Sequence, residues 1–204
     1  MIEKRDLEFC FKGNRTYVQG PDIFDTVMAY LSIRFSSMVN VKYTAYNMLH
    51  KNATLVLTNK VIKKNYSTIN SLISFVADDL KYYAVISENH NDIICRKEYF
   101  EDIVNDNAII HGEEIIFHNI LPDSYTEIAV SMNKLFLKRT IDVEGKWIVT
   151  KFDYFDFASI KNIQGKEIKL ELKQNLNNTL TKSKMYLDNQ EVGHLYFSLI
   201  QKES

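Results

Sequence analysis

The segment 17–35 constrains the fold more than any other, because an extended run leads through Gly20 and Pro21 directly into an apolar helix. Gly20 and Pro21 end the extended run, and Asp22 is the expected N-cap, since short polar side chains cap helices well. Apolar residues then recur at helical spacing, at Phe24, Val27, Met28, Leu31 and Phe35. A helix with so few charged residues needs cover on most of its surface, so we expect it to be largely buried.

A second segment, 119–136, repeats this pattern at an offset of 101 residues, which aligns Pro21 with Pro122. The same offset pairs Pro-Asp with Pro-Asp and matches the apolar positions of the first helix with Tyr125, Ile128, Ala129, Met132 and Phe136. Because the offset is close to half of the 204 residues, the pattern predicts a duplicated unit. Two unrelated amphipathic helices entered through a proline would also align in this way, so the order of the other elements matters.

Alternation of apolar and polar residues predicts strands around both helices. In the first half the expected strands lie within 7–18, 39–45, 53–58 and 69–87, the last broken at Asp78-Asp79. In the second half we expect a helix at 124–138 and strands at 113–118, 147–154, 167–173, 181–187 and 193–200. We expect segments 39–45 and 53–58 to pair with each other as antiparallel strands.

The element order predicts an α+β protein whose two halves repeat one arrangement. The first unit is expected at 1–88 and the second at 113–204. Between them, the polar segment 89–112 is the expected connection, with a short helix near 98–104.

Composition excludes several functional classes. The chain has 25 Lys and Arg against 26 Asp and Glu, so there is no overall electrostatic case for nucleic acid. No run approaches the roughly 20 apolar residues of a membrane span, and the first residues lack signal-peptide features, so we expect a cytoplasmic protein. Cys10 and Cys95 have no CxxC partner or histidine cluster, and we expect both to be reduced and buried. No metal site and no cofactor is expected.

The duplicated order of strand, apolar helix and antiparallel strands resembles the double hotdog arrangement. Two stretches add to the resemblance, Gly20-Pro-Asp-Ile-Phe-Asp25 at the first helix and Gly193-His-Leu-Tyr-Phe-Ser-Leu199 at the last strand. The resemblance implies two tandem units, each an antiparallel sheet wrapped around a central helix. It also implies acyl thioesters of coenzyme A or acyl carrier protein as substrates, in lipid or polyketide metabolism. An unrelated α+β fold with two chance helices is the alternative.

Pro21-Asp-Ile-Phe-Asp25 is similar to the Pro-x-x-x-Asp motif of polyketide synthase dehydratase domains, which are double hotdogs. The resemblance implies His118, shortly before Pro122, as the partner of Asp25. This chain departs from the family pattern: no glycine follows His118, Ala29 replaces the expected Gln or His, the halves are reversed, and His-Phe-Pro-Gly is missing. Dehydration, thioester hydrolysis and non-catalytic acyl binding therefore all stay open, and with them the question of whether the chain is a lyase, a hydrolase or no enzyme.

The candidate site residues have structural explanations as well as functional ones. The expected acid or base groups are Asp25, His118 and Glu127, and the expected substrate-binding residues are Asn14, Gln19, Gly20 and Asn119. Carboxylates in the first turn of a helix also stabilise its dipole, and Ser124 to Glu127 fits a capping box. Amides in loops commonly cap turns.

The expected partners follow from the resemblance. They are acyl-CoA or acyl carrier protein, and the basic segment 60–64 could receive a phosphate of the carrier or remain a solvated loop. We expect no nucleic-acid partner, and a homodimer is one compatible assembly.

Overall fold

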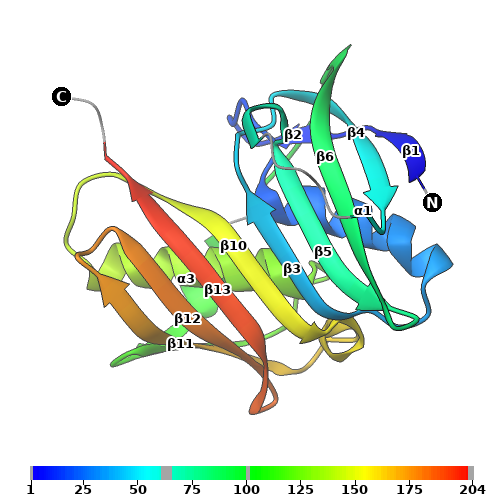
Figure 1. The fold of residues 1–204 in the computed structure, drawn as a ribbon. Helices are drawn as coiled ribbons and strands as arrows, with labels where there is room; N and C mark the ends of the chain where they lie inside the picture. The colour runs from blue at the N-terminus through cyan, green and yellow to red at the C-terminus, as the bar shows by residue number, and fades with distance from the viewer. Residues whose placement is uncertain (1, 61–65, 100–101, 202–204) are drawn as a thin grey trace. The chain divides into compact units, whose positions relative to one another are not determined.

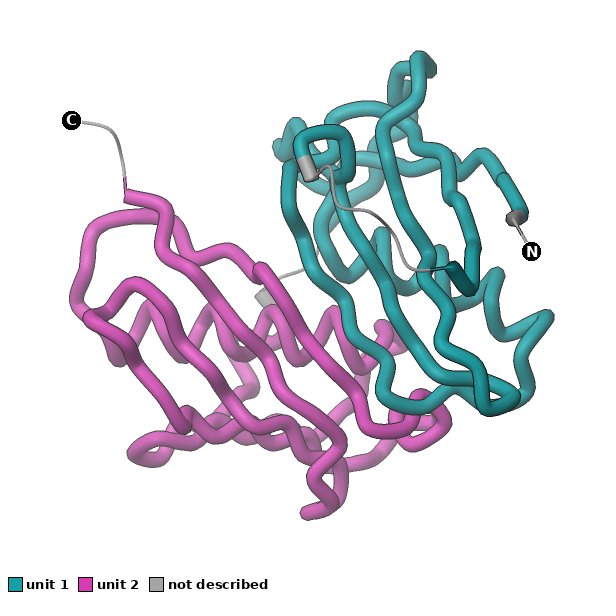
Figure 2. The backbone as a smooth tube through the Cα atoms, in the orientation of Figure 1, with its two compact units in different colours: residues 1–99 teal, residues 100–204 magenta. Residues whose placement is uncertain are grey.

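The computed structural model describes residues 2–60, 66–99 and 102–201, and its backbone is traced in Figure 1. The chain divides into two compact units, Met1–Tyr99 and Phe100–Ser204, shown in different colours in Figure 2. Apart from Lys60, the basic segment 60–64 lies outside the described residues. No helix in the described part of the chain is long and apolar enough to cross a membrane.

The first unit is an antiparallel sheet with one long helix on one face (Figure 1). Its elements are β1 (Ile2–Leu7), β2 (Cys10–Lys12), α1 (Gly20–Arg34), β3 (Val39–Ala45), β4 (Lys51–Thr58), η1 (Tyr66–Thr68), β5 (Ser71–Ala77), β6 (Leu80–Asp92) and β7 (Cys95–Lys97). The sheet runs in the order β1-β4-β6-β5-β3, and β2 pairs separately with β7 in a short parallel ladder. The Phe24 ring of α1 packs edge-on against Tyr43 of β3 at 6.3 Å between ring centroids, which places the core between helix and sheet.

The expected pairing of segments 39–45 and 53–58 is wrong. β3 pairs with β5, whereas β4 pairs with β1 and β6. After β3 the chain does not form a hairpin, because the backbone N–H groups of Tyr46 and Asn47 both donate to Asn70 O, ahead of β5. The expected break at Asp78-Asp79 is confirmed: both residues have positive φ, 48° and 60°, as a tight two-residue hairpin between β5 and β6 requires.

The second unit has the same kind of architecture, with α3 covering one face of a sheet (Figure 1). Its elements are α2 (Asp102–Asn107), β8 (Ile109–His111), β9 (Glu114–His118), α3 (Tyr125–Thr140), β10 (Lys146–Asp156), η2 (Phe157–Ile160), β11 (Glu167–Leu176), β12 (Leu180–Leu187) and β13 (Gln190–Ile200). Within this unit the strands lie in the order β10-β13-β12-β11-β9-β8. The segment expected to connect the units thus carries the end of β6, β7, α2 and β8.

The matched apolar positions of the two helices are buried in both. Phe24, Val27, Met28 and Leu31 are at most 1% exposed, and their counterparts on α3 are equally covered. The prolines, however, are placed differently, since Pro21 lies inside the first turn of α1 and Pro122 lies ahead of α3.

The expected N-cap Asp22 is wrong, because α1 begins at Gly20 and Gln19 occupies the N-cap position. Proline is tolerated in the first turn of a helix, where its missing N–H would be unpaired anyway, so the helix begins before Pro21 rather than after it. Asp22 instead lies in the first turn of α1, and its Oδ1 is 2.8 Å from Lys12 Nζ.

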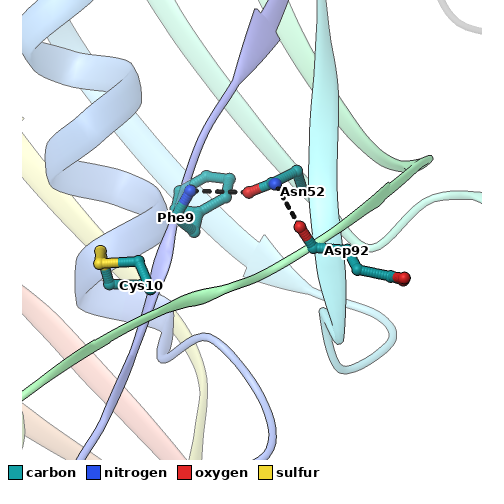
Figure 3. Close-up of a disulfide and its surroundings, with 5 residues drawn as sticks. Phe9, Cys10, Asn52 and Asp92 are labelled. Atoms are coloured by element: carbon teal, nitrogen blue, oxygen red, sulfur yellow. Dashed lines mark hydrogen bonds between the residues drawn. A yellow bond between two sulfur atoms is a disulfide. The ribbon is translucent and has the colours of Figure 1, made fainter.

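The expectation of two reduced cysteines is also wrong, because Cys10 and Cys95 form a disulfide between β2 and β7 (Figure 3). The two residues are 85 positions apart in sequence but directly paired in the parallel ladder. Beside the disulfide, the Asn52 side chain accepts from Phe9 N at 2.8 Å and donates to Asp92 O at 3.0 Å (Figure 3). These contacts attach both ends of the first unit to β4.

Candidate functional site

The start of α1 has features of a site that binds a polar or anionic group. Gln19 at the N-cap makes no side-chain capping bond, and its Nε2 atom is buried without a hydrogen-bond partner among the described residues. The first N–H groups of any helix lack partners within the helix and carry the positive end of its dipole. Gln19 and Gly20 lie together at this helix start, and the half-buried Asp25 lies further along α1.

The loop ahead of α1 is held in place by β7 and by the segment just before β4. Val18 N donates to Leu49 O at 2.8 Å, and Arg96 donates to Gly13 O and, at 3.0 Å, to Arg15 O. Asn14, predicted to bind substrate, lies exposed in this loop.

Sequence reasoning missed Lys12 and Arg96. Lys12 brings a positive charge to the first turn of α1 through its contact with Asp22. Its only sequence signal was its place shortly before the helix. Arg96 could be found only from the pairing of β2 with β7, since it follows Cys95 directly.

The start of α3 is built differently from that of α1. Ser124 is its N-cap, and Ser124 Oγ accepts from Glu127 N at 3.1 Å, which confirms the serine half of the expected capping box. Burial raises the pKa of Tyr125 well above its ordinary value, so its hydroxyl stays protonated and donates to Tyr186 O at 3.0 Å. The start of α3 is therefore capped by Ser124, and Tyr125 anchors its first turn to the backbone of Tyr186.

The remaining predicted site residues lie at the end of β9. The His118 side chain is 72% exposed, and its Nε2 atom is 3.9 Å from Glu167 Oε2 on the neighbouring strand β11. Asn119 is 1% exposed; its Nδ2 donates to Ile163 O at 3.1 Å, and its Oδ1 accepts from Leu121 N at 2.8 Å. The Asn119 amide thus shapes the turn that leads toward α3.

No protein-family model matches the chain, and no curated protein matches it. Solved structures do. The chain is similar to an isomerase-inactive variant of GphF DH1, with a TM-score of 0.50 and 9% identity over 100% of this chain and 93% of that one. An inactive mutant of the CurJ dehydratase has a TM-score of 0.50 and 10% identity, over 97% of this chain and 90% of that one. A tesB protein of Mycobacterium avium subs paratuberculosis has a TM-score of 0.49 and 7% identity, over 97% of this chain and 93% of that one.

The chain has the hotdog fold. The resemblance expected from the sequence is therefore confirmed at the level of the fold. Within this hotdog protein, the uncapped start of α1, with Gln19 and Asp25, is the strongest candidate for a functional site.

Proposed function

We propose that the chain is a double hotdog protein that processes acyl thioesters, with dehydration of a 3-hydroxyacyl group on coenzyme A or acyl carrier protein as the first candidate reaction. The observation that carries the proposal is the difference between the two helix starts. Ser124 caps α3, whereas α1 has no side-chain cap and has the unpartnered Gln19 Nε2 beside it. Two units with the same kind of architecture support the tandem arrangement.

In the proposed mechanism the first N–H groups of α1 hold the thioester oxygen, because the helix dipole stabilises negative charge that develops there. Asp25 of α1 is the proposed acid and base. It takes the proton from the α-carbon and returns it to the leaving β-hydroxyl, so that water and an α,β-unsaturated acyl thioester are the products. Gln19 Nε2 donates a hydrogen bond to the substrate carbonyl.

A non-catalytic acyl-binding module is the second candidate, and the position of His118 favours it. A side chain that is 72% exposed and paired with Glu167 is poorly shielded from water for proton transfer. In this case α1 would still bind the thioester while no reaction follows.

The cellular location is a separate question. A disulfide such as Cys10–Cys95 is typical of oxidising compartments, which counts against the cytoplasmic location expected from the sequence.

The test is to incubate the purified protein with 3-hydroxyacyl and with saturated acyl thioesters and to follow the products by mass spectrometry. We expect loss of water from the hydroxyacyl substrate, slowed about 10²–10⁴-fold by Asp25→Asn. Asp123→Asn is the matched control, because it removes an exposed carboxylate just before the other helix. Release of free acid would make hydrolysis, not dehydration, the reaction. Retained ligand without turnover would support the binding module. The absence of both turnover and binding would contradict the proposal.

A further inference from the structure

Three polar side chains lie buried between α3 and β12 in the core of the second unit. Asn133 on α3 and Thr181 and Ser183 on β12 are each 1% exposed. Thr181 and Ser183 are two residues apart on one strand, so both side chains project from the inner face of the sheet toward the helix. In Figure 1 α3 lies behind β12 and β13.

The hydrogen bonds within this cluster are incomplete. Ser183 Oγ donates to Asn133 Oδ1 at 2.8 Å. Asn133 Nδ2 and Thr181 Oγ1, however, are buried with no hydrogen-bond partner among the residues that the structure describes. Buried polar groups elsewhere in this unit have partners: both side-chain atoms of Asn119 are bonded, and Thr126 Oγ1 lies 2.9 Å from Tyr154 Oη.

The positions of these polar groups suit a bound molecule between α3 and β12. α3 contacts β12 at Tyr125–Tyr186 and again at Asn133–Ser183, so the helix runs antiparallel to the strand and its next turn passes toward Thr181. Side chains two residues apart on a strand are about 7 Å apart, so a single water oxygen cannot bond both hydroxyls. Ser183 already bonds Asn133 Oδ1, which leaves Asn133 Nδ2 and Thr181 Oγ1 as the two groups that a water would bridge.

The surroundings of the two hydroxyls are apolar on the β13 side, where Phe197 is paired with Thr181 and Leu195 with Ser183, and both apolar side chains are 1% exposed. On the β11 side Thr181 is paired with Asn175, which lies exposed and whose Nδ2 donates to Asn178 Oδ1. Unpaired buried donors are costly, and two to four polar partners are what an internal water requires.

We propose that Asn133 Nδ2 and Thr181 Oγ1 form a binding site for one ordered water molecule. The water accepts a hydrogen bond from Asn133 Nδ2 and donates to Thr181 Oγ1. It completes the bonding of Asn133 and links the middle of α3 to β12, so that the central helix of this unit is positioned by a polar contact as well as by its apolar stripe.

The variant Thr181→Val distinguishes a hydrated site from a dry one by the sign of its effect, because valine has nearly the shape of threonine but lacks the hydroxyl. With a bound water, the variant removes one of its partners, and we expect the thermal midpoint to fall by about 2–4 °C. In a dry site the variant would remove an unsatisfied polar group, and a midpoint that rises would overturn the proposal. Thr126→Val is the matched control, since its direct contact with Tyr154 is lost and its midpoint falls in either case.

A crystal structure of the unmodified protein decides the same question without a variant. We expect electron density for one water within about 3.2 Å of both Asn133 Nδ2 and Thr181 Oγ1. Density that is absent at a resolution where other internal waters are visible would overturn the proposal.

Discussion

At the scale of single residues, Gly193 shows how tightly the second sheet is assembled. Gly193 of β13 is paired with Tyr154 of β10. A Cβ atom at Gly193 would lie 1.9 Å from Asp153 O and 3.1 Å from Tyr154 Cα. Both are backbone atoms, so the contact cannot be relieved by the rotation of a side chain. Only glycine allows the two strands to approach this closely.

We therefore expect Gly193→Ala to lower the free energy of unfolding by about 2–4 kcal/mol, as measured by urea denaturation. Gly112→Ala is the control. Gly112 has a φ of +56°, but a Cβ atom added there would meet nothing within 4 Å, so only backbone strain of about 1 kcal/mol is expected. Equal losses in the two variants would contradict a steric origin.

At the scale of elements, the two long helices begin in physically different ways. The start of α3 is stabilised by Ser124, whose hydroxyl accepts from Glu127 N. The start of α1 has Gln19 at the equivalent position without a capping bond. A helix start without a side-chain cap leaves N–H groups that water or a ligand can bind, which is why the function is proposed at α1 and not at α3.

The difference predicts opposite outcomes for two alanine variants. Ser124→Ala should lower the free energy of unfolding by about 1 kcal/mol, because a capping hydrogen bond is lost. Gln19→Ala should leave stability nearly unchanged but weaken binding of an acyl thioester, measured by calorimetry. A clear stability loss in Gln19→Ala, with binding unchanged, would mean that Gln19 is a structural residue.

At the scale of the whole molecule, the disulfide belongs to one unit only. Cys10 and Cys95 both lie in Met1–Tyr99, and they join the start and the end of that unit. The cross-link closes a loop that contains most of the unit, and such loops restrict the unfolded chain strongly.

Replacement of both cysteines by serine should therefore destabilise residues 1–99 by about 2–4 kcal/mol. Hydrogen exchange measured by mass spectrometry should become faster in these residues and stay unchanged in 100–204. The control is the unmodified protein, whose cysteines should not react with thiol reagents before reduction. Free thiols in that protein, or equally faster exchange in both units, would contradict the prediction.

The sequence by itself determined those features that depend on neighbouring residues. Helical spacing identified the buried positions of α1 and α3, and the Asp78-Asp79 turn and the Ser124 cap were readable for the same reason. Element order then led to the hotdog fold, which the solved structures confirm.

Only the tertiary structure decided which distant segments meet. Alternation predicted β3 and β4 but could not show that Asn70 would take the N–H groups after β3 and direct that strand to β5. Cys10 and Cys95 gave no signal, because their pairing follows from β2 and β7 lying side by side. Three atoms without a hydrogen-bond partner among the described residues, Gln19 Nε2, Asn133 Nδ2 and Thr181 Oγ1, were likewise invisible in the sequence, since whether a polar group is satisfied depends on what the whole fold places around it.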